Sequence, residues 1–285
     1  MRDVRRQRGP GQQTGGAQAK AISSLQNDRI KAIRALEMRK VRRETGLFVA
    51  EGASVLISAH EAGWRAETLV CEPGGAESPV VRALIDKAVS EGVEVLEVTP
   101  AVLAKVASKD NPQAVLGVFQ QRFADAPAAA DLGLDDVWLV LEEVRDPGNL
   151  GTIIRTADAV GARGIVLVGN CCDPYSRESI RATMGSVFAV PLVRMTREVF
   201  LNWRDLWPGD VVGLHLSGAE DFRTAQYKEP VLVAMGSEGP GLSPELTEAC
   251  SRRVKIPMAG RLDSLNLAVA TALTLYQIRG PYLKL

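Results

Sequence analysis

The chain has 285 residues with 34 basic and 34 acidic side chains, and 46% of its residues are hydrophobic. This length allows two domains with cores of their own, and the balanced composition indicates a soluble globular protein. No apolar run approaches the ~20 residues needed to cross a bilayer, and the first residues lack the apolar segment of a signal peptide. We therefore expect a cytoplasmic protein with no membrane partner.

The cysteines and histidines argue against a metal centre. The four cysteines show no Cys-x-x-Cys spacing, and the two histidines, His60 and His215, lie far apart in the sequence. Ligands for structural zinc usually come in closely spaced pairs. We predict that the chain has no metal site and that its thiols are reduced and structural.

The zero net charge hides an asymmetry between the start of the chain and the rest. Residues 1–45 hold twelve Lys or Arg and four Asp or Glu, a net charge of +8, which leaves −8 for the remainder. Residues 1–22 are rich in Gly, Gln and Arg with few apolar side chains, so we expect a disordered basic tail. Its arginines could contact phosphate groups, or could only keep the tail soluble.

A basic helix is predicted after the tail, from Asn27 to Arg43, with a narrow apolar side that includes Ile30 and Ile33. One sign of charge at this density favours an anionic partner over a face that is only solvated. The candidate RNA contacts on this helix are Arg29, Lys31, Arg34, Arg39, Lys40, Arg42 and Arg43.

Short apolar strands then alternate with helical segments, which predicts a small α/β domain. Strands are expected at residues 47–50, 68–71, 93–98 and 115–119, and helices at 54–62, 80–91 and 101–106, with a polar loop at 108–112. The Ala- and Asp-rich stretch from Ala124 to Gly133 has no amphipathic pattern and marks a domain boundary. The expected divisions are a tail (1–22), a first domain (23–122), a linker (123–134) and a second domain (135–285).

The second domain repeats strand and helix to the end of the chain. Strands are expected at residues 137–141, 164–168, 189–192, 211–216, 231–235 and 254–256, and helices at 150–160, 177–184, 198–206, from 244, and over the last apolar segment. The strands are continuous apolar runs, which predicts a parallel sheet covered on both faces. Apolar residues cover all sides of the last helix, so we expect it to be enclosed.

Three strand-loop-helix units of this domain place polar residues after the carboxyl end of a strand, where open α/β sheets bind ligands. Glycines in such loops let the backbone approach a ligand closely. No Gly-x-Gly-x-x-Gly pattern is present, which disfavours a standard dinucleotide fold. The loops are Asp146-Pro-Gly-Asn-Leu-Gly-Thr-Ile-Ile-Arg155, Gly236-Ser-Glu-Gly-Pro-Gly-Leu242, and Ile256-Pro-Met with Asp263-Ser-Leu-Asn266.

Together the three loops resemble the motifs of the SpoU/TrmH family of the SPOUT superfamily, which are S-adenosylmethionine-dependent RNA ribose methyltransferases. They occur in the family's order and spacing, and the likeness extends from Val137 to Leu285. Residues 25–119 resemble the substrate-binding domain that many of these enzymes carry, which is similar in fold to a ribosomal protein that binds kinked RNA. The resemblance implies a C-terminal trefoil knot and a homodimer whose interface lies beside the methyl-donor site.

By motif position, the resemblance implies that Arg155 acts on the ribose 2′-hydroxyl. A guanidinium is almost always charged, so anchoring a phosphate is the chemically easier role, and both roles stay open. Asn149 would orient Arg155 or the RNA, or would only cap its helix. Glu238 would fix Arg155 or Asn149, within one chain or across the dimer. Ser264 and Asn266 would bind the target nucleotide or cap the last helix.

For the donor, S-adenosylmethionine, the resemblance implies backbone groups at Gly236, Ile256, Met258 and Leu265, with Leu214 after its strand; Ile256 and Leu265 could equally be core residues. The expected reaction is RNA 2′-O-methylation. Ribosomal RNA, and within it 23S RNA, is favoured over transfer RNA, because a whole extra domain with a basic helix suits a large structured substrate. The alternative is a non-catalytic RNA-binding or ribosome-assembly factor with the same fold.

Overall fold

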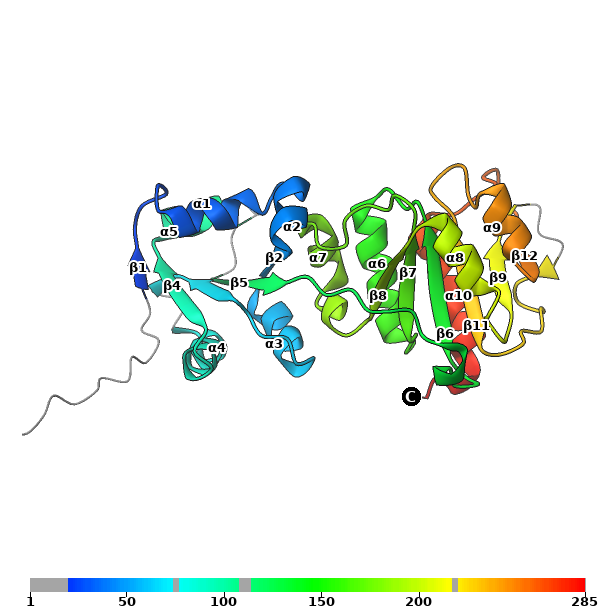
Figure 1. The fold of residues 1–285 in the computed structure, drawn as a ribbon, viewed down its shortest axis with the longest axis horizontal. Helices are drawn as coiled ribbons and strands as arrows, with labels where there is room; N and C mark the ends of the chain where they lie inside the picture. The colour runs from blue at the N-terminus through cyan, green and yellow to red at the C-terminus, as the bar shows by residue number, and fades with distance from the viewer. Residues whose placement is uncertain (1–19, 74–76, 108–113, 217–219, 285) are drawn as a thin grey trace, which may run out of the picture.

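The computed structural model describes residues 20–73, 77–107, 114–216 and 220–284 (Figure 1). Two α/β domains follow one another along the long axis, the N-terminal one in blue and cyan and the C-terminal one in green to red. The predicted α/β fold class is therefore confirmed. The predicted tail over residues 1–19 and the polar loop at 108–112 lie outside the described residues.

The N-terminal domain is a mixed sheet with helices on both faces. The sheet has the strand order β1-β4-β3-β5-β2, in which β5 is antiparallel to β2 and β3 and the other pairs are parallel. Ile30 and Leu103 are buried on one face, and Leu56 and Val81 on the other. The elements are β1 (Lys20–Ile22), α1 (Asp28–Ala35), α2 (Arg39–Thr45), β2 (Leu47–Glu51), α3 (Ala53–Glu61), β3 (Thr68–Cys71), α4 (Pro79–Ser90), β4 (Glu94–Val98), α5 (Pro100–Val106) and β5 (Val115–Gln120).

The end of the predicted tail is ordered as an edge strand. β1 pairs in parallel with β4, with Lys20 opposite Leu96. The Lys20 ammonium also lies 3.1 Å from the Glu94 carboxylate. The expectation of disorder is therefore wrong for Lys20–Ile22, because a strand partner from another part of the chain satisfies their backbone groups.

The basic segment predicted as one helix forms two. α1 ends at Ala35 and α2 begins at Arg39. The Arg42 guanidinium donates through Nη1 to the carbonyl oxygens of Leu36 and Glu37, at 2.7 and 2.8 Å, in place of the amide donors of a continuous helix. The residues between the two helices are good helix formers. The break therefore depends on tertiary contacts that local sequence does not reveal.

The C-terminal domain contains a seven-stranded sheet with the order β10-β12-β9-β11-β6-β7-β8, and every pair in it is parallel. The strand expected at 189–192 is displaced to 192–195, because a short 3-10 turn occupies the residues before it. The elements are η2 (Ala129–Asp131), β6 (Val137–Glu142), α6 (Pro147–Ala159), β7 (Gly164–Val168), α7 (Arg177–Thr183), η3 (Ser186–Phe188), β8 (Leu192–Met195), α8 (Arg197–Arg204), β9 (Val211–Leu214), β10 (Glu220–Asp221), β11 (Val231–Met235), α9 (Pro244–Ala249), β12 (Arg252–Lys255), α10 (Leu267–Arg279) and η4 (Gly280–Tyr282).

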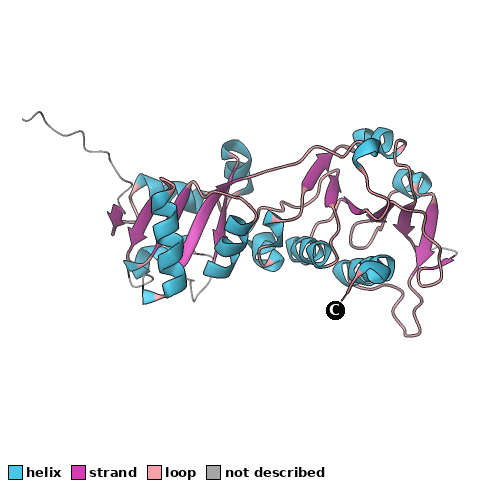
Figure 2. Ribbon diagram, turned by 90° about the horizontal axis from the view of Figure 1, so that it is seen from below, coloured by secondary structure: helices cyan, strands magenta, loops and turns pink. Residues whose placement is uncertain are grey.

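Helices cover both faces of this sheet (Figure 2). α6 and α10 bury Ile154 and Leu275 on one face, and α8 and α9 bury Phe200 and Leu246 on the other. A parallel sheet covered in this way accounts for the continuous apolar strands of the sequence. Within the described ranges, no helix is long and apolar enough to cross a membrane.

The last helix is only partly enclosed by its own chain. Val269, Leu273 and Tyr276 are 48%, 42% and 50% exposed. Their spacing of four and three residues places them on one side of α10. The prediction that the chain encloses this helix is therefore wrong, and an apolar stripe lies at the surface of the single subunit.

The segment between the two domains is docked on the C-terminal domain. The Ala124 N–H donates to the carbonyl oxygen of Leu192 at 2.8 Å, and the Trp203 indole N–H donates to that of Pro127 at 3.0 Å. Leu132 packs against the core under α8. The segment predicted as a linker is therefore held along its length by the domain that follows it.

An aromatic cluster joins the domains, and we call it the seam cluster. The ring centroids of Phe48 and Tyr175 lie 4.6 Å apart, and those of Trp64 and Phe188 lie 5.1 Å apart. The Trp64 indole N–H also donates across the boundary to the carbonyl oxygen of Phe188 at 2.9 Å. Phe119 completes the cluster, 5.1 Å from Phe188. The apolar core therefore runs without interruption from one domain into the other.

Candidate functional site

A cavity of about 650 Å³ lies where the carboxyl ends of β9, β11 and β12 meet the start of α10. The walls include three of the predicted polar site residues, Glu238, Ser264 and Asn266. All five residues predicted for the methyl donor also line it: Leu214, Gly236, Ile256, Met258 and Leu265. Leu265 is 37% exposed and is not a core residue, whereas Ile256 is half-buried and packs against the core as well as lining the cavity.

The glycine-rich loop after β11 forms one wall because it folds back on itself. Ser237 and Gly241 exchange two backbone hydrogen bonds, at 3.1 and 3.0 Å. A Cβ atom on Gly236 would lie 1.9 Å from the carbonyl carbon of Gly241, so only glycine fits this close approach. Gly239 and Gly241 have φ angles of +101° and +76°, which side chains disfavour.

Three polar side chains from the three motif loops are hydrogen-bonded in a row. The Asn149 Nδ2 group donates to Glu238 Oε1 at 3.0 Å, and the Asn266 Nδ2 group donates to Asn149 Oδ1 at 2.9 Å. The backbone N–H groups of Arg145 and Asp146 also donate to the Glu238 carboxylate, at 3.1 and 3.4 Å. The network therefore ties the first motif to both of the others beside the cavity.

The Glu238 carboxyl is held in its charged form by this network. Partial burial alone would raise its pKa, but the hydrogen bonds from the Asn149 amide and from backbone N–H groups outweigh that effect and lower it. Of the two partners predicted for Glu238, the structure provides Asn149. A fixed negative charge at the mouth of the cavity follows from this arrangement.

The helices that follow the first and third motif loops are capped by different kinds of site residue. Asp146 caps α6, accepting the Asn149 N–H at 2.6 Å, so Asn149 lies inside the helix with its side chain free to bridge. Asn266 caps α10 by accepting the N–H groups of Ala268 and Val269, while its Nδ2 group holds Asn149. Of the two roles considered for Asn266, the structure shows the helix cap, and binding of the target nucleotide stays a prediction.

Arg155 lies apart from the cavity and the network. It is exposed on α6 and is not one of the lining residues. Helical side chains six positions apart point about 120° away from one another. Arg155 therefore faces away from Asn149 within the same chain.

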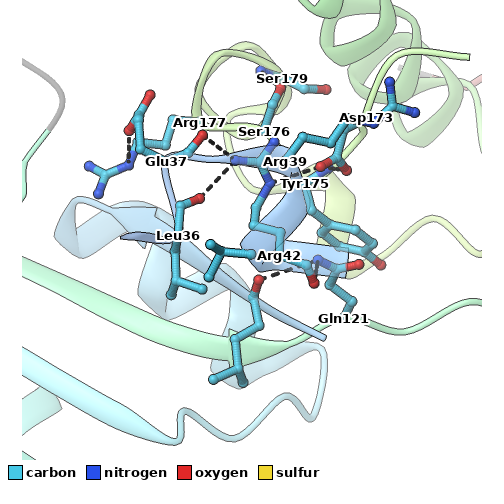
Figure 3. Close-up of polar contacts among 12 residues, drawn as sticks. Leu36, Glu37, Arg39, Arg42, Gln121, Asp173, Tyr175, Ser176, Arg177 and Ser179 are labelled. Carbon is cyan, nitrogen blue, oxygen red and sulfur yellow. Dashed lines mark hydrogen bonds and ion pairs between the residues drawn. The ribbon is translucent and has the colours of Figure 1, made fainter. Parts of the chain in front are cut away.

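Arg42 does not belong to the exposed basic surface. Its side chain is 5% exposed and its Nε group lies 2.8 Å from Asp173 (Figure 3). The prediction that Arg42 contacts RNA is therefore wrong, because the guanidinium is used for an ion pair between the domains. The other six predicted RNA contacts are exposed, and three of these also form surface ion pairs: Arg29, Lys31 and Lys40.

Two exposed arginines near the domain boundary, Arg122 and Arg194, are not among the RNA contacts predicted from the sequence. The Arg122 guanidinium lies 4.2 Å from the centre of the Trp64 ring, and that of Arg194 lies 3.8 Å from the centre of the Phe123 ring. Desolvation lowers the pKa of Arg194, and the neighbouring charges of Arg39 and Arg43 lower it further against the opposing effect of Asp173. The fold thus brings Arg194 close to α2. Arg122, at the end of the predicted first domain, and Arg194, in β8, are isolated arginines that no charge pattern in the sequence marks.

No group of three or more His, Cys, Asp or Glu side chains that could hold a metal ion occurs among the residues described. Burial raises the pKa of Cys172 to about 12 and that of Cys250 to about 11. These thiols are therefore protonated at neutral pH and poorly nucleophilic.

Comparison with known proteins gives consistent matches over nearly the whole chain. Residues 136–276 match the model of the SpoU rRNA Methylase family, and residues 27–117 match that of the MRM3-like substrate binding domain. An uncharacterised tRNA/rRNA methyltransferase of Synechocystis is 33% identical, with 91% of this chain and 93% of the relative covered. A 23S rRNA (uridine(2479)-2′-O)-methyltransferase of Streptomyces viridochromogenes is 31% identical, with 84% of each covered.

Solved structures agree with these relatives. The crystal structure of an AdoMet-bound rRNA methyltransferase from Sinorhizobium meliloti superimposes with a TM-score of 0.85 and 45% sequence identity. The match covers 93% of this chain and 99% of that one. The likeness therefore includes both domains.

Proposed function

Because the chain belongs to the SpoU rRNA methylase family, whose members use S-adenosylmethionine, we propose that this methyltransferase modifies the 2′-hydroxyl of a ribose in 23S ribosomal RNA. The observation that carries the proposal is the row of hydrogen bonds from Glu238 through Asn149 to Asn266 at the cavity. The 2′-O-methyltransferase named among the relatives supports the position of the methyl group. The expected place of action is the cytoplasm.

The cavity fits S-adenosylmethionine in size and lining. Pockets of roughly 300–1,000 Å³ with apolar walls and a few fixed polar groups are typical of such ligands. Leu214, Ile256 and Met258 supply the apolar walls, and the folded loop brings the backbone of Gly236 to the cavity. When bound, the donor supplies an electrophilic methyl group on a sulfonium. The residues of the chain orient the acceptor toward it. The loops carrying the second and third motifs share this cavity, where the expected knot would form.

The residues around the cavity have distinct tasks in this proposal. A ribose hydroxyl is a weak nucleophile until its proton is removed. Holding the hydroxyl in line with the methyl donor can raise the rate by several orders of magnitude. Ser264 and Asn266 would bind the target nucleotide at the cavity mouth. Arg155 would anchor its phosphate or take part in deprotonation. The negative charge of Glu238 would keep Asn149 oriented throughout.

Because Arg155 faces away from its own cavity, we propose that a second copy of the chain completes the site. The stripe of Val269, Leu273 and Tyr276 on α10 begins beside Leu265, which lines the cavity. Exposed apolar stripes of this kind mark protein interfaces. Pairing of α10 and α6 with their counterparts would cover the stripe and bring Arg155 toward the partner's cavity.

RNA would be bound by the exposed cations of α2 together with those near the domain boundary. Arg39, Arg43 and Arg194 come from both domains, so one stretch of RNA backbone could contact both. Phosphate contacts of this type give affinity and register without reading bases. Arg34 of α1 would extend this surface.

The test is methylation with tritiated S-adenosylmethionine of three substrates: unmodified ribosomal RNA, large ribosomal subunits, and transfer RNA. The labelled RNA is then digested to nucleosides. Label in a 2′-O-methyl nucleoside of 23S RNA supports the proposal, whereas label on a base or only in transfer RNA contradicts it. Binding of the donor without transfer to any RNA would favour the non-catalytic alternative.

Replacement of Arg155 by Ala should lower kcat by about 10²- to 10⁴-fold, as expected for loss of a group that assists proton transfer. The affinity for S-adenosylmethionine should not change, because Arg155 does not line the cavity of its own chain. Arg155→Lys separates the two roles, since retention of most activity indicates phosphate anchoring. Full activity of Arg155→Ala would remove Arg155 from the mechanism.

A further inference from the structure

A buried ion pair crosses the boundary between the domains (Figure 3). Arg42 Nε lies 2.8 Å from Asp173 Oδ2, and the two side chains are 5% and 6% exposed. The second oxygen of Asp173 accepts the Tyr175 N–H at 3.0 Å and lies 4.0 Å from the guanidinium of Arg194. Arg42 also holds the carbonyl oxygens of Leu36 and Glu37 between α1 and α2. Both partners are thus fixed by further bonds inside their own domains.

Stability alone gives little reason for such a pair. The desolvation of two charges offsets most of their attraction, and apolar residues at such positions are often as stabilising. The adjacent seam cluster is already aromatic and packs without strict direction. An ion pair, in contrast, has one favourable geometry. It therefore selects one angle between the domains from those that aromatic packing would allow.

The segment that carries Asp173 leads directly to the catalytic loops. The Cys172 N–H donates to the carbonyl oxygen of Val144 at 2.7 Å. Val144 is followed by Arg145, whose N–H binds the Glu238 carboxylate at 3.1 Å. On the other side, the Arg39 guanidinium donates to the carbonyl oxygen of Cys171 at 3.1 Å. One short segment therefore contacts α2 of the RNA-binding domain and the first motif loop.

A second ion pair across the domain boundary supports the same angle between the two domains. Arg177, at the start of α7, lies 2.8 Å from Glu37, and its side chain is 9% exposed. α7 packs against α6, where the Ser179 carbonyl oxygen lies so close to Gly151 that a side chain there would clash. α6 in turn carries both Asn149 and Arg155.

We propose that Asp173 is a positioning residue, which through its ion pair with Arg42 holds the RNA-binding domain at the angle from which bound RNA reaches the methyl donor. The inference rests on the proposed function for its substrate. It adds a role for two buried residues that touch neither donor nor RNA. Loss of the pair should leave each binding step intact and misplace the acceptor hydroxyl, which lowers kcat more than it raises KM.

The test uses the full-length chain with Asp173→Asn, which keeps the shape and removes the charge opposite Arg42. Because an unpaired buried Arg42 could unfold the chain, the charge-neutral double variant R42Q/D173N is measured beside it. Glu44→Gln is the matched control, since Glu44 lies on the same helix α2 and forms only an exposed ion pair with Lys40. The measurements are kcat, the KM for RNA and the affinity for S-adenosylmethionine.

The expected result for a folded variant is a tenfold or larger fall in kcat, with KM within threefold and donor affinity within twofold of the wild type. Wild-type kcat in the folded double variant would overturn the proposal, and so would a parallel loss of donor affinity. Small-angle X-ray scattering tests the angle between the domains without RNA. An altered profile of R42Q/D173N supports control of the domain angle, and an unchanged profile overturns it. Failure of the wild type to methylate RNA would instead count against the proposed function.

Discussion

Replacement of Asn149 by Asp tests whether the three motif loops are held together as the structure shows. The Asn149 Nδ2 group lies 3.0 Å from Glu238 Oε1, so the variant would set two carboxylates at that distance. Two unit charges 3 Å apart repel by ~1.4 kcal/mol in bulk water and by ~5.5 kcal/mol at an effective dielectric constant of 20. Glu238 is half-buried, which places the cost between these limits.

This repulsion should make the variant depend on pH with the opposite sign to the wild type. The folded-state pKa of Glu238 is lowered in the wild type, so its contribution to stability is present above the unfolded pKa and is lost as pH falls through the folded value. In Asn149→Asp the two carboxyls share a proton, with an apparent pKa raised by about one to four units. The variant should therefore match the wild type near pH 4 and lose stability as pH rises toward 8.

Thermal unfolding followed at several pH values between 4 and 8 measures this difference. A loss of about 3 kcal/mol corresponds to a fall of roughly 6 °C in Tm for a chain of this size. Asn149→Ala is the control, because it removes the same hydrogen bonds, worth about 2 kcal/mol, without adding a charge. If the two variants show the same difference from the wild type at every pH, the proximity of Asn149 to Glu238 is refuted.

Three further predictions address the interface, the RNA surface and the donor site. Leu273→Asp should convert a dimer to a monomer in analytical ultracentrifugation and lower methyl transfer, whereas an unchanged dimer would contradict the use of the α10 stripe. Arg43→Ala should flatten the plot of log affinity for RNA against log salt by about 0.7 to 0.9, while Glu44→Gln on the same helix should not. Gly236→Ala should abolish donor binding in calorimetry, because the new Cβ would lie 1.9 Å from the carbonyl carbon of Gly241. Donor affinity within threefold of the wild type would contradict that account.

The order of strands and helices was readable because buried parallel strands are continuous apolar runs. The strand predicted at 231–235 is β11 (Val231–Met235), and its neighbours are displaced by only a few residues. The pattern of apolar residues predicts that a helix face is buried, but it does not show whether the same chain or another subunit buries it. For this reason the sequence predicts an enclosed last helix, although Leu273 and Tyr276 on its outer side are exposed in the single subunit.

The candidate site was predictable in its composition and not in its contacts. Polar residues after strand ends indicated the cavity, because the carboxyl ends of parallel strands meet at one edge of a sheet. The bond between Asn149 and Glu238 joins positions 89 residues apart, and no local pattern encodes it. Charge density on α2 likewise could not distinguish Arg42, which turns inward to Asp173, from Arg43, which stays exposed.

The uninterrupted core at the seam cluster bears on how the chain unfolds. The two family models divide the chain between residues 117 and 136, but Phe48 and Phe119 share their packing with Tyr175 and Phe188. Separating the domains would expose these rings to water, and neither half would keep the core that it has in the whole chain. We therefore expect the two domains to melt together in one transition. The boundary between the two family models therefore does not coincide with a break in the apolar core.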